Sequence, residues 1–149
     1  MAHIGFIGLG HMGLPMAQSL LSAGHEVIGF DKETEPMKAL KEAGGRVAST
    51  LQEVAEKQDV VISMLQTGEQ VSVICLGDAG VFQVMRPGTL FVDCSTIDVE
   101  TSRLVHREAG ECKLFMVDAP VSGGVLGACE ARLTFMVGGD ETAFQKAEP

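Results

Sequence analysis

The chain has 149 residues, of which 46% are hydrophobic and 21% charged, so it is long enough to fold as one globular domain around its own core. Its formal net charge is −9, and its 11 basic residues are scattered, which argues against a surface for nucleic acid. No apolar run is long enough to span a membrane, and no targeting segment opens the chain. The sequence therefore predicts a cytoplasmic protein without nucleic-acid or membrane partners.

The four cysteines lie far apart in the chain, at positions Cys75, Cys94, Cys112 and Cys129. They form no C-x-x-C motif and no Cys/His ligand spacing, so neither a metal site nor a redox motif is predicted. Three of them lie in or beside apolar stretches, where buried free thiols in a reducing compartment are expected.

The first predicted strand, Ile4–Gly8, runs directly into a G-x-G-x-x-G loop. The loop consists of Gly8, Leu9, Gly10, His11, Met12 and Gly13. Gly8 permits the tight turn out of the strand, Gly10 lets a pyrophosphate approach the backbone, and Gly13 lets the next helix pack close to the sheet. The helix N-terminus then offers free N–H groups and a positive dipole end to phosphates. This context predicts a dinucleotide site. His11 lies inside the loop, where contact with the cofactor and a merely tolerated loop residue are equally good interpretations.

The helix after this loop is predicted over residues 12–22, where apolar residues recur at helical spacing and Gly24 follows as a cap. A second strand over residues 26–30 ends at Asp31, 18 residues beyond the glycine loop. A carboxylate at this place accepts hydrogen bonds from the adenosine ribose of NAD and repels the 2′-phosphate of NADP. The basic Lys32 that follows leaves NADP open as an alternative.

Strand and helix patterns alternate along the rest of the chain. Strands are predicted over residues 47–48, 60–65, 90–94, 113–117 and 133–137. Helices are predicted over residues 36–43, 70–76 and 98–109, directly after Thr50, and from residue 141 onward. A single helical turn is predicted over residues 82–85. Gly110 is expected to end the helix before it. The alternation predicts an α/β fold, a doubly wound Rossmann-type and mostly parallel sheet with helices on both faces. We expect residues 1–149 to be one dinucleotide-binding domain, truncated within its last helix.

In such sheets, ligands bind beyond the carboxyl ends of the strands. Three segments leave predicted strands at this edge, namely Met64–Thr67, Cys94–Thr96 and Val121–Gly124. In the last of these, Ser122 offers a hydroxyl, and Gly123 and Gly124 expose backbone N–H groups suited to a carboxylate or oxyanion. The same spacing also fits a flexible glycine turn that binds nothing.

Four stretches occur in a fixed order along the chain: Gly5–Ala17, Asp93–Ile97, Asp118–Gly124 and Met136–Gly139. Together they resemble the N-terminal half of the β-hydroxyacid dehydrogenases, and among these the 3-hydroxyisobutyrate dehydrogenases. The resemblance is collinear over essentially the whole chain, and the D-A-P-V-S-G-G stretch is its most specific part. It implies a homo-oligomeric full-length enzyme that moves a hydride between NAD and a small β-hydroxy acid. Tartronate semialdehyde, other short semialdehyde and glyoxylate reductases remain alternatives.

The resemblance also implies roles for the matching positions. The loop from Gly8 to Gly13 holds the pyrophosphate, and Asp31 holds the adenosine ribose. The cofactor site is completed by Met64, Leu65, Gln66 and Thr96, although the methionines also fit an apolar core. The substrate carboxylate is bound by Ser122, Gly123 and Gly124.

The general acid/base of these enzymes is a lysine in a G-x-G-x-x-x-K-x-x-x-N helix, and this pattern does not occur here. Lys146 has the wrong surroundings. We therefore expect no catalytic residue in this chain, with the lysine and an all-helical domain beyond Pro149. The chain alone is expected to bind the cofactor without turnover, and to expose apolar surface that favours self-association. A non-catalytic nucleotide-binding or oligomerisation module is the alternative from another class.

Two positions depart from the family pattern. Gln66 stands where a proline is usual, which puts the rigidity of that loop in question. Ala131 stands where a glycine is usual, which is expected to shift the turn before the last strand. Arg132, next to it, fits a solvated edge better than a substrate contact.

Overall fold

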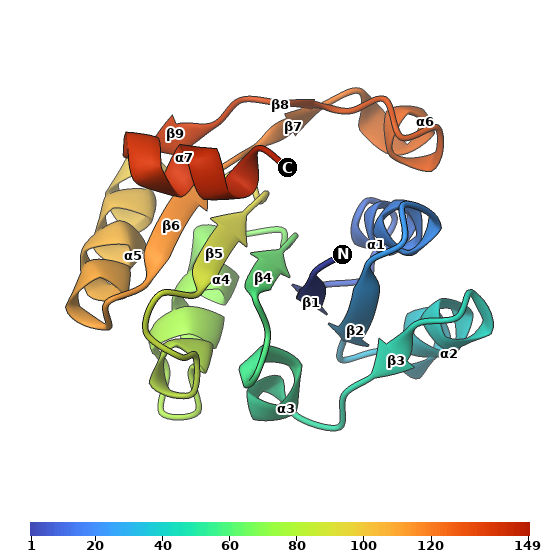
Figure 1. The fold of residues 1–149 in the computed structure, drawn as a ribbon, viewed down its shortest axis with the longest axis horizontal. Helices are drawn as coiled ribbons and strands as arrows, with labels where there is room; N and C mark the ends of the chain where they lie inside the picture. Colours follow the sequence, from blue (N-terminus) through green and yellow to red (C-terminus); the bar gives the residue numbers. More distant parts are fainter.

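Seven strands form the main sheet of the computed structural model, which describes residues 1–149 (Figure 1). In spatial order they are β3 (Arg46–Val47), β2 (Glu26–Phe30), β1 (His3–Ile7), β4 (Val60–Ser63), β5 (Leu90–Asp93), β6 (Phe115–Asp118) and β9 (Gly138–Gly139). All neighbours pair in parallel except β9, which runs antiparallel to β6. The predicted doubly wound, mostly parallel sheet is confirmed, with the strand order reversing between β1 and β4.

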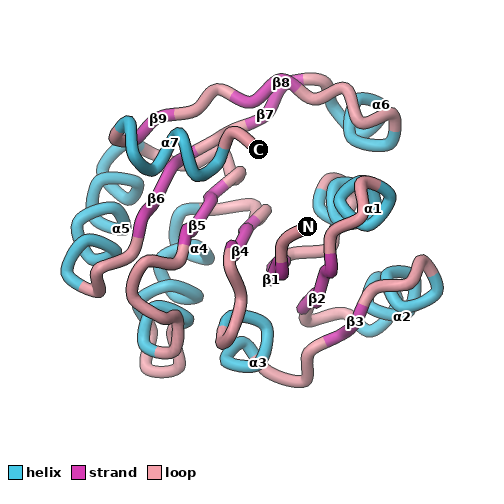
Figure 2. Tube along the Cα trace, viewed as in Figure 1, coloured by secondary structure: helices cyan, strands magenta, loops and turns pink.

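Helices cover both faces of this sheet (Figure 2). One face carries α3 (Leu51–Ala55), α4 (Gly68–Leu76), α5 (Val99–Glu111) and the 3₁₀ turn η1 (Val81–Gln83). The other carries α1 (Gly13–Ser22), α2 (Thr34–Glu42), α6 (Gly124–Cys129) and α7 (Glu141–Ala147). No helix has the length and apolar character needed to cross a membrane.

The central strands are apolar on both faces because each face is packed against helices. Successive side chains alternate between the two layers. Val61 and Phe91 lie in the core beneath α4 and α5. The Phe91 and Phe82 rings meet there edge to face, with their ring centres 5.1 Å apart. Phe6 packs with Met16 on the α1 side. This packing fixes the strand register and hence the position of every loop at the carboxyl edge.

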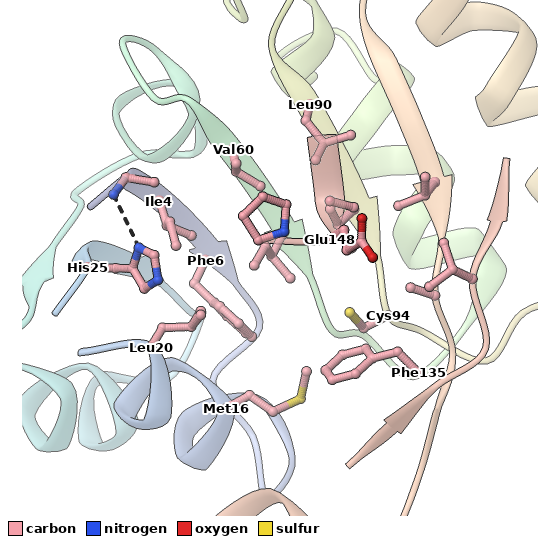
Figure 3. Close-up of a pocket in the computed structure, with 18 of the residues that line it drawn as sticks. Ile4, Phe6, Met16, Leu20, His25, Val60, Leu90, Cys94, Phe135 and Glu148 are labelled. Carbon is pink, nitrogen blue, oxygen red and sulfur yellow. Dashed lines mark hydrogen bonds between the residues drawn. The ribbon is translucent and has the colours of Figure 1, made fainter. Parts of the chain in front are cut away.

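The α1 side of the sheet is only partly covered. An apolar groove of about 530 Å³ lies between α1 and α7, over β1, β4 and β5. Figure 3 shows Ile4, Phe6 and Leu90 along its floor and Phe135 at its rim. Phe135 is 48% exposed. The structure therefore carries the exposed apolar surface that the sequence analysis expects.

The prediction of a single strand over 133–137 is wrong. Residues Thr134–Phe135 (β8) instead pair with Val121–Ser122 (β7) in a separate two-stranded sheet, and only β9 joins the main sheet. The strand predicted over 60–65 also ends early, at Ser63. Its ladder stops because the Leu65 N–H donates to the Ser95 hydroxyl, and not to a neighbouring strand.

Two helix predictions also need correction. Gly110 does not end α5, which continues to Glu111; the left-handed conformation that follows the helix falls to Lys113, with φ +58°. Helix α6 was not predicted, because its glycine-rich sequence has low helix propensity. Its Gly127 lies close to Leu133, so tertiary packing compensates for propensity.

Candidate functional site

The carboxyl ends of β1 and β4 lie side by side at the point where the strand order reverses. Connections from these two strands leave in opposite directions along the sheet, and this is the place where sheets of this kind bind ligands. Gly8 follows β1 and Met64 follows β4, and the Met64 N–H donates to the Ile7 carbonyl at 2.9 Å. The predicted glycine loop and the predicted Met64–Gln66 segment therefore lie next to each other at the carboxyl ends of β1 and β4.

Each glycine of the loop has a different physical reason to be glycine. Gly8 has φ +93°, and a Cβ there would collide with the Met64 carbonyl. A Cβ on Gly13 would collide with the Gly8 carbonyl, so the helix start packs directly on the turn. A Cβ on Gly10 would meet no protein atom within 4 Å. Gly10 therefore borders open space, as an approaching pyrophosphate requires.

The other loop residues divide between core and surface. Leu9 is buried, and the partly buried Met12 packs against the same core cluster. His11 is exposed. Contact between His11 and a cofactor stays a prediction.

Asp31 lies at the end of β2 and closes the loop from the other side. Its carboxylate accepts the Leu9 N–H at 2.7 Å and the Glu33 N–H at 2.9 Å. A carboxylate offers about four acceptor positions, so it keeps capacity for ribose hydroxyls. The neighbouring Lys32 is exposed. Asp31 thus both shapes the loop and presents an anionic acceptor beside it.

The segment after β4 is held at several points. Met64 and Leu65 pack against the cores on opposite faces of the sheet. The exposed Gln66 donates its backbone N–H to the Gln70 side-chain oxygen at 3.0 Å. Thr67 and Gln70 form a capping box at the start of α4. Gln66 therefore does not loosen the loop, because it supplies a hydrogen bond that proline lacks.

A buried polar network links this segment to the end of β5. Oδ1 of Asp93 accepts the Ser63 hydroxyl at 2.9 Å and the Ser95 N–H at 3.0 Å, and the Ser95 hydroxyl oxygen accepts the Leu65 N–H at 2.8 Å. Burial raises the pKa of Asp93, and the nearby Asp118 carboxylate raises it further, while the Ser95 and Ser63 hydrogen bonds oppose the shift. Sequence reasoning missed Asp93 and Ser63, although an acidic residue ending an apolar strand was a usable signal.

Thr96 follows this network and is exposed at the same edge. A polar cavity of about 420 Å³ lies beside it, lined among others by Arg103, His106 and Asp118. His106 Nε2 lies 3.9 Å from Asp118 Oδ1. Asp118 ends β6 and opens the Asp118–Gly124 stretch named in the sequence analysis, whereas no motif points to Arg103 or His106, which come from α5.

Ser122 lies at the end of β7, exposed and paired opposite Thr134. Gly123 and Gly124 are also exposed and have φ +133° and +63°, conformations that favour glycine. The segment is therefore fixed between a strand pair and α6, and is more than a loose glycine turn. Its binding role stays a prediction.

None of the remaining reactive side chains has the surroundings of a catalytic or metal-binding group. The Lys146 ammonium lies 4.7 Å from the centre of the Phe115 ring, on the α7 side. All four cysteines are free, and burial raises the pKa of Cys94 to about 12, which keeps it an unreactive thiol. No group of three or more metal-ligating side chains is present.

Comparisons with known proteins agree with this geometry. An NAD-dependent L-serine dehydrogenase of Pseudomonas aeruginosa is 46% identical over 149 residues, and a probable 3-hydroxyisobutyrate dehydrogenase of Mycobacterium tuberculosis is also 46% identical. A solved structure of M. tuberculosis 3-hydroxyisobutyrate dehydrogenase with L-serine superposes with a TM-score of 0.94. Each match covers 100% of this chain and 50% of the relative.

The chain thus spans about half the length of the curated relatives it matches. Residues 3–149 also match the family described as the NAD binding domain of 6-phosphogluconate dehydrogenase. Fold, glycine loop and sequence similarity all agree, and the chain belongs to this family of NAD-binding domains and is similar to one half of the 3-hydroxyisobutyrate dehydrogenases.

Proposed function

We propose that this chain is the cofactor-binding half of a dehydrogenase that oxidises a small β-hydroxy acid. The observation that carries the proposal is the glycine loop, in which Asp31 accepts the Leu9 N–H at the point of the carboxyl edge where the strand order reverses between β1 and β4. The open space at Gly10 fits a dinucleotide pyrophosphate. When bound, the nicotinamide accepts a hydride from the substrate carbon that bears the hydroxyl.

Each predicted residue has a proposed task in this reaction. The backbone of Gly8–Gly13 and the start of α1 bind the pyrophosphate. Asp31 binds the adenosine ribose. Leu65, Gln66 and Thr96, with Met64 behind them, line the nicotinamide half.

The proposed cofactor is NAD, because the Asp31 carboxylate repels a 2′-phosphate. A neighbouring structure that is 28% identical was solved with NADP⁺, so both cofactors belong in the test. Lys32 is the exposed cation next to Asp31 that would accommodate a 2′-phosphate.

For the substrate we propose a small acid with a primary alcohol on the carbon β to its carboxylate. The relatives are named for 3-hydroxyisobutyrate and L-serine, which share this unit and differ in a methyl or an amino group on the α-carbon. Ser122 and the N–H groups of Gly123 and Gly124 are the proposed carboxylate cradle. The base that takes the hydroxyl proton is proposed to be a lysine outside residues 1–149.

The apolar groove between α1 and α7 supports a further part of this proposal. An exposed apolar surface of this kind is usually covered by another part of the protein or by a second copy. We propose that the full-length protein is a homo-oligomer and that the isolated chain self-associates. Light scattering after size exclusion tests this, and a monomeric chain at micromolar concentration would contradict it.

Two measurements test the proposed function. Calorimetric titration of the chain with NAD⁺ and NADP⁺ should show binding with preference for NAD⁺; a chain that binds neither sinks the proposal. The full-length protein should reduce NAD⁺ with 3-hydroxyisobutyrate, L-serine or another member of a β-hydroxy acid panel. Cofactor binding without oxidation of any such acid would favour the non-catalytic nucleotide-binding module.

A further inference from the structure

Asp93 is the most unusual buried group of the molecule that the proposed reaction does not use. Its exposed fraction is 0%, and it ends β5 on the face covered by α4 and α5. Its Oδ2 atom has no hydrogen-bond partner. An unpaired buried carboxyl oxygen costs stability, so an apolar residue would serve a purely structural role better.

The partners of Asp93 come from two different parts of the chain. Ser63 ends β4, and Ser95 lies two residues after the end of β5. Both donate to the same atom, Oδ1. One carboxyl oxygen therefore ties together the ends of two adjacent strands at the carboxyl edge of the sheet.

The network continues from Ser95 into the neighbouring loop. The Ser95 N–H is held by Asp93, which sets the orientation of the residue, and its hydroxyl oxygen accepts the Leu65 N–H at 2.8 Å. Leu65 leads to Gln66, and Ser95 leads to Thr96. These are the two loops that the proposed function places at the nicotinamide half of the cofactor.

We propose that Asp93 is a positioning residue, which acts through Ser95 to hold the Leu65–Gln66 and Ser95–Thr96 loops in the one arrangement that accepts the nicotinamide half of the cofactor. This inference rests on the proposed function. It assigns no contact between Asp93 and the cofactor. The adenosine half, bound at Gly8–Gly13 and Asp31, does not depend on Asp93.

The test compares two ligands that share the adenosine half. NAD⁺ carries the nicotinamide and ADP-ribose lacks it, and both are titrated calorimetrically into the chain. We expect Asp93→Ala to weaken NAD⁺ binding about tenfold, the equivalent of one lost hydrogen bond, and to leave ADP-ribose within about twofold. Asp93→Asn keeps an acceptor oxygen and should restore most of the NAD⁺ affinity.

A second set of variants tests whether Asp93 acts through Ser95. Ser95→Ala should cause the same selective loss, and the double variant should be no worse than either single one, since both break one chain of contacts. Ser95→Ala and Asp93→Asn also decide the matter if Asp93→Ala does not fold. Thr89→Val is the matched control, because Thr89 is buried next to the opposite end of the same strand; it should change neither affinity.

The outcomes separate the inference from the function on which it rests. A wild-type chain that binds neither ligand overturns the proposed function. A wild type that binds both, with variants that lose NAD⁺ and ADP-ribose equally or lose neither, overturns only the role of Asp93. The role also fails if the wild type binds NAD⁺ no more tightly than ADP-ribose, because the two loops then hold no nicotinamide.

Discussion

Two glycine-containing segments lie at the carboxyl edge of the sheet, and their surroundings differ. The Gly8–Gly13 loop is enclosed by β1, β4 and α1, and both of its end glycines are buried. The Ser122–Gly124 segment is exposed, and only its backbone angles demand glycine. The chain therefore determines the shape of the first segment through its own packing. The second segment is exposed, and the chain's own packing determines its shape less completely.

The sharpest test of this contrast is a pair of alanine substitutions in the first loop. Gly13→Ala places a Cβ against the Gly8 carbonyl, a clash that should destabilise the fold by about 3 kcal/mol and abolish NAD⁺ binding. Gly10→Ala is the matched control, because its Cβ meets no protein atom within 4 Å. It should fold with near wild-type stability in urea and still lose NAD⁺ affinity. Unchanged affinity in Gly10→Ala would show that no pyrophosphate approaches there.

The second largest effect is expected at Asp31. Asp31→Asn keeps one acceptor for the Leu9 or Glu33 N–H and removes the charge that repels a 2′-phosphate. NAD⁺ should bind about tenfold more weakly, while NADP⁺ binding should hold or improve. Titration with both cofactors checks this. Glu35→Gln on α2 is the control, since Glu35 contacts only Lys38 at the surface. An equal loss for both cofactors would mean that Asp31 serves loop shape alone.

Asp93 lies between the two segments, and its ionisation should make the free energy of unfolding depend on pH. Its folded-state pKa is raised, mainly by burial, so its stabilising contribution is complete below about pH 4, the range of an unperturbed carboxyl, and is lost as the pH rises from there through the raised folded-state pKa. Asp93→Asn cannot ionise. The stability of this variant relative to wild type should therefore increase from pH 4 toward neutral pH in urea titrations. Parallel pH curves for the two proteins would contradict a raised pKa.

The contrast also explains which features could be predicted from sequence. Gly8, Gly13 and Asp31 act through local chain geometry, and a short motif records such geometry directly. In the Asp93 network, the contact between Ser63 and Asp93 joins residues 30 positions apart, which meet only after β4 and β5 have paired, so no local spacing predicts that contact.

The part of the chain around the second segment was predicted less well for the same reason. Residues 133–137 have the composition of one strand, but only Thr134–Phe135 (β8) pairs there, with β7, whereas the strand that joins the main sheet is β9, directly after this range, and pairing is a tertiary property. Helix α6 forms through contacts with α1, among them the Ser19 hydroxyl donating to the Ala128 carbonyl at 3.3 Å. A glycine-rich sequence gives no local sign of such contacts.

The smallest expected effect lies in the turn between α6 and β8. The sequence analysis expects alanine at position 131 to shift this turn, whereas Ala131 adopts φ +54° and so takes the left-handed conformation of the usual glycine. An L-residue there carries roughly 1 kcal/mol of strain, which glycine relieves at some cost in unfolded-state entropy. Ala131→Gly should therefore stabilise the chain by less than about 1 kcal/mol in urea titrations. Ala39→Gly within α2 is the control and should destabilise by about 1 kcal/mol. If both variants lower the free energy of unfolding by the same amount, the left-handed conformation at Ala131 carries no strain. The turn between α6 and β8 would then be as free of backbone strain as the Gly8–Gly13 loop.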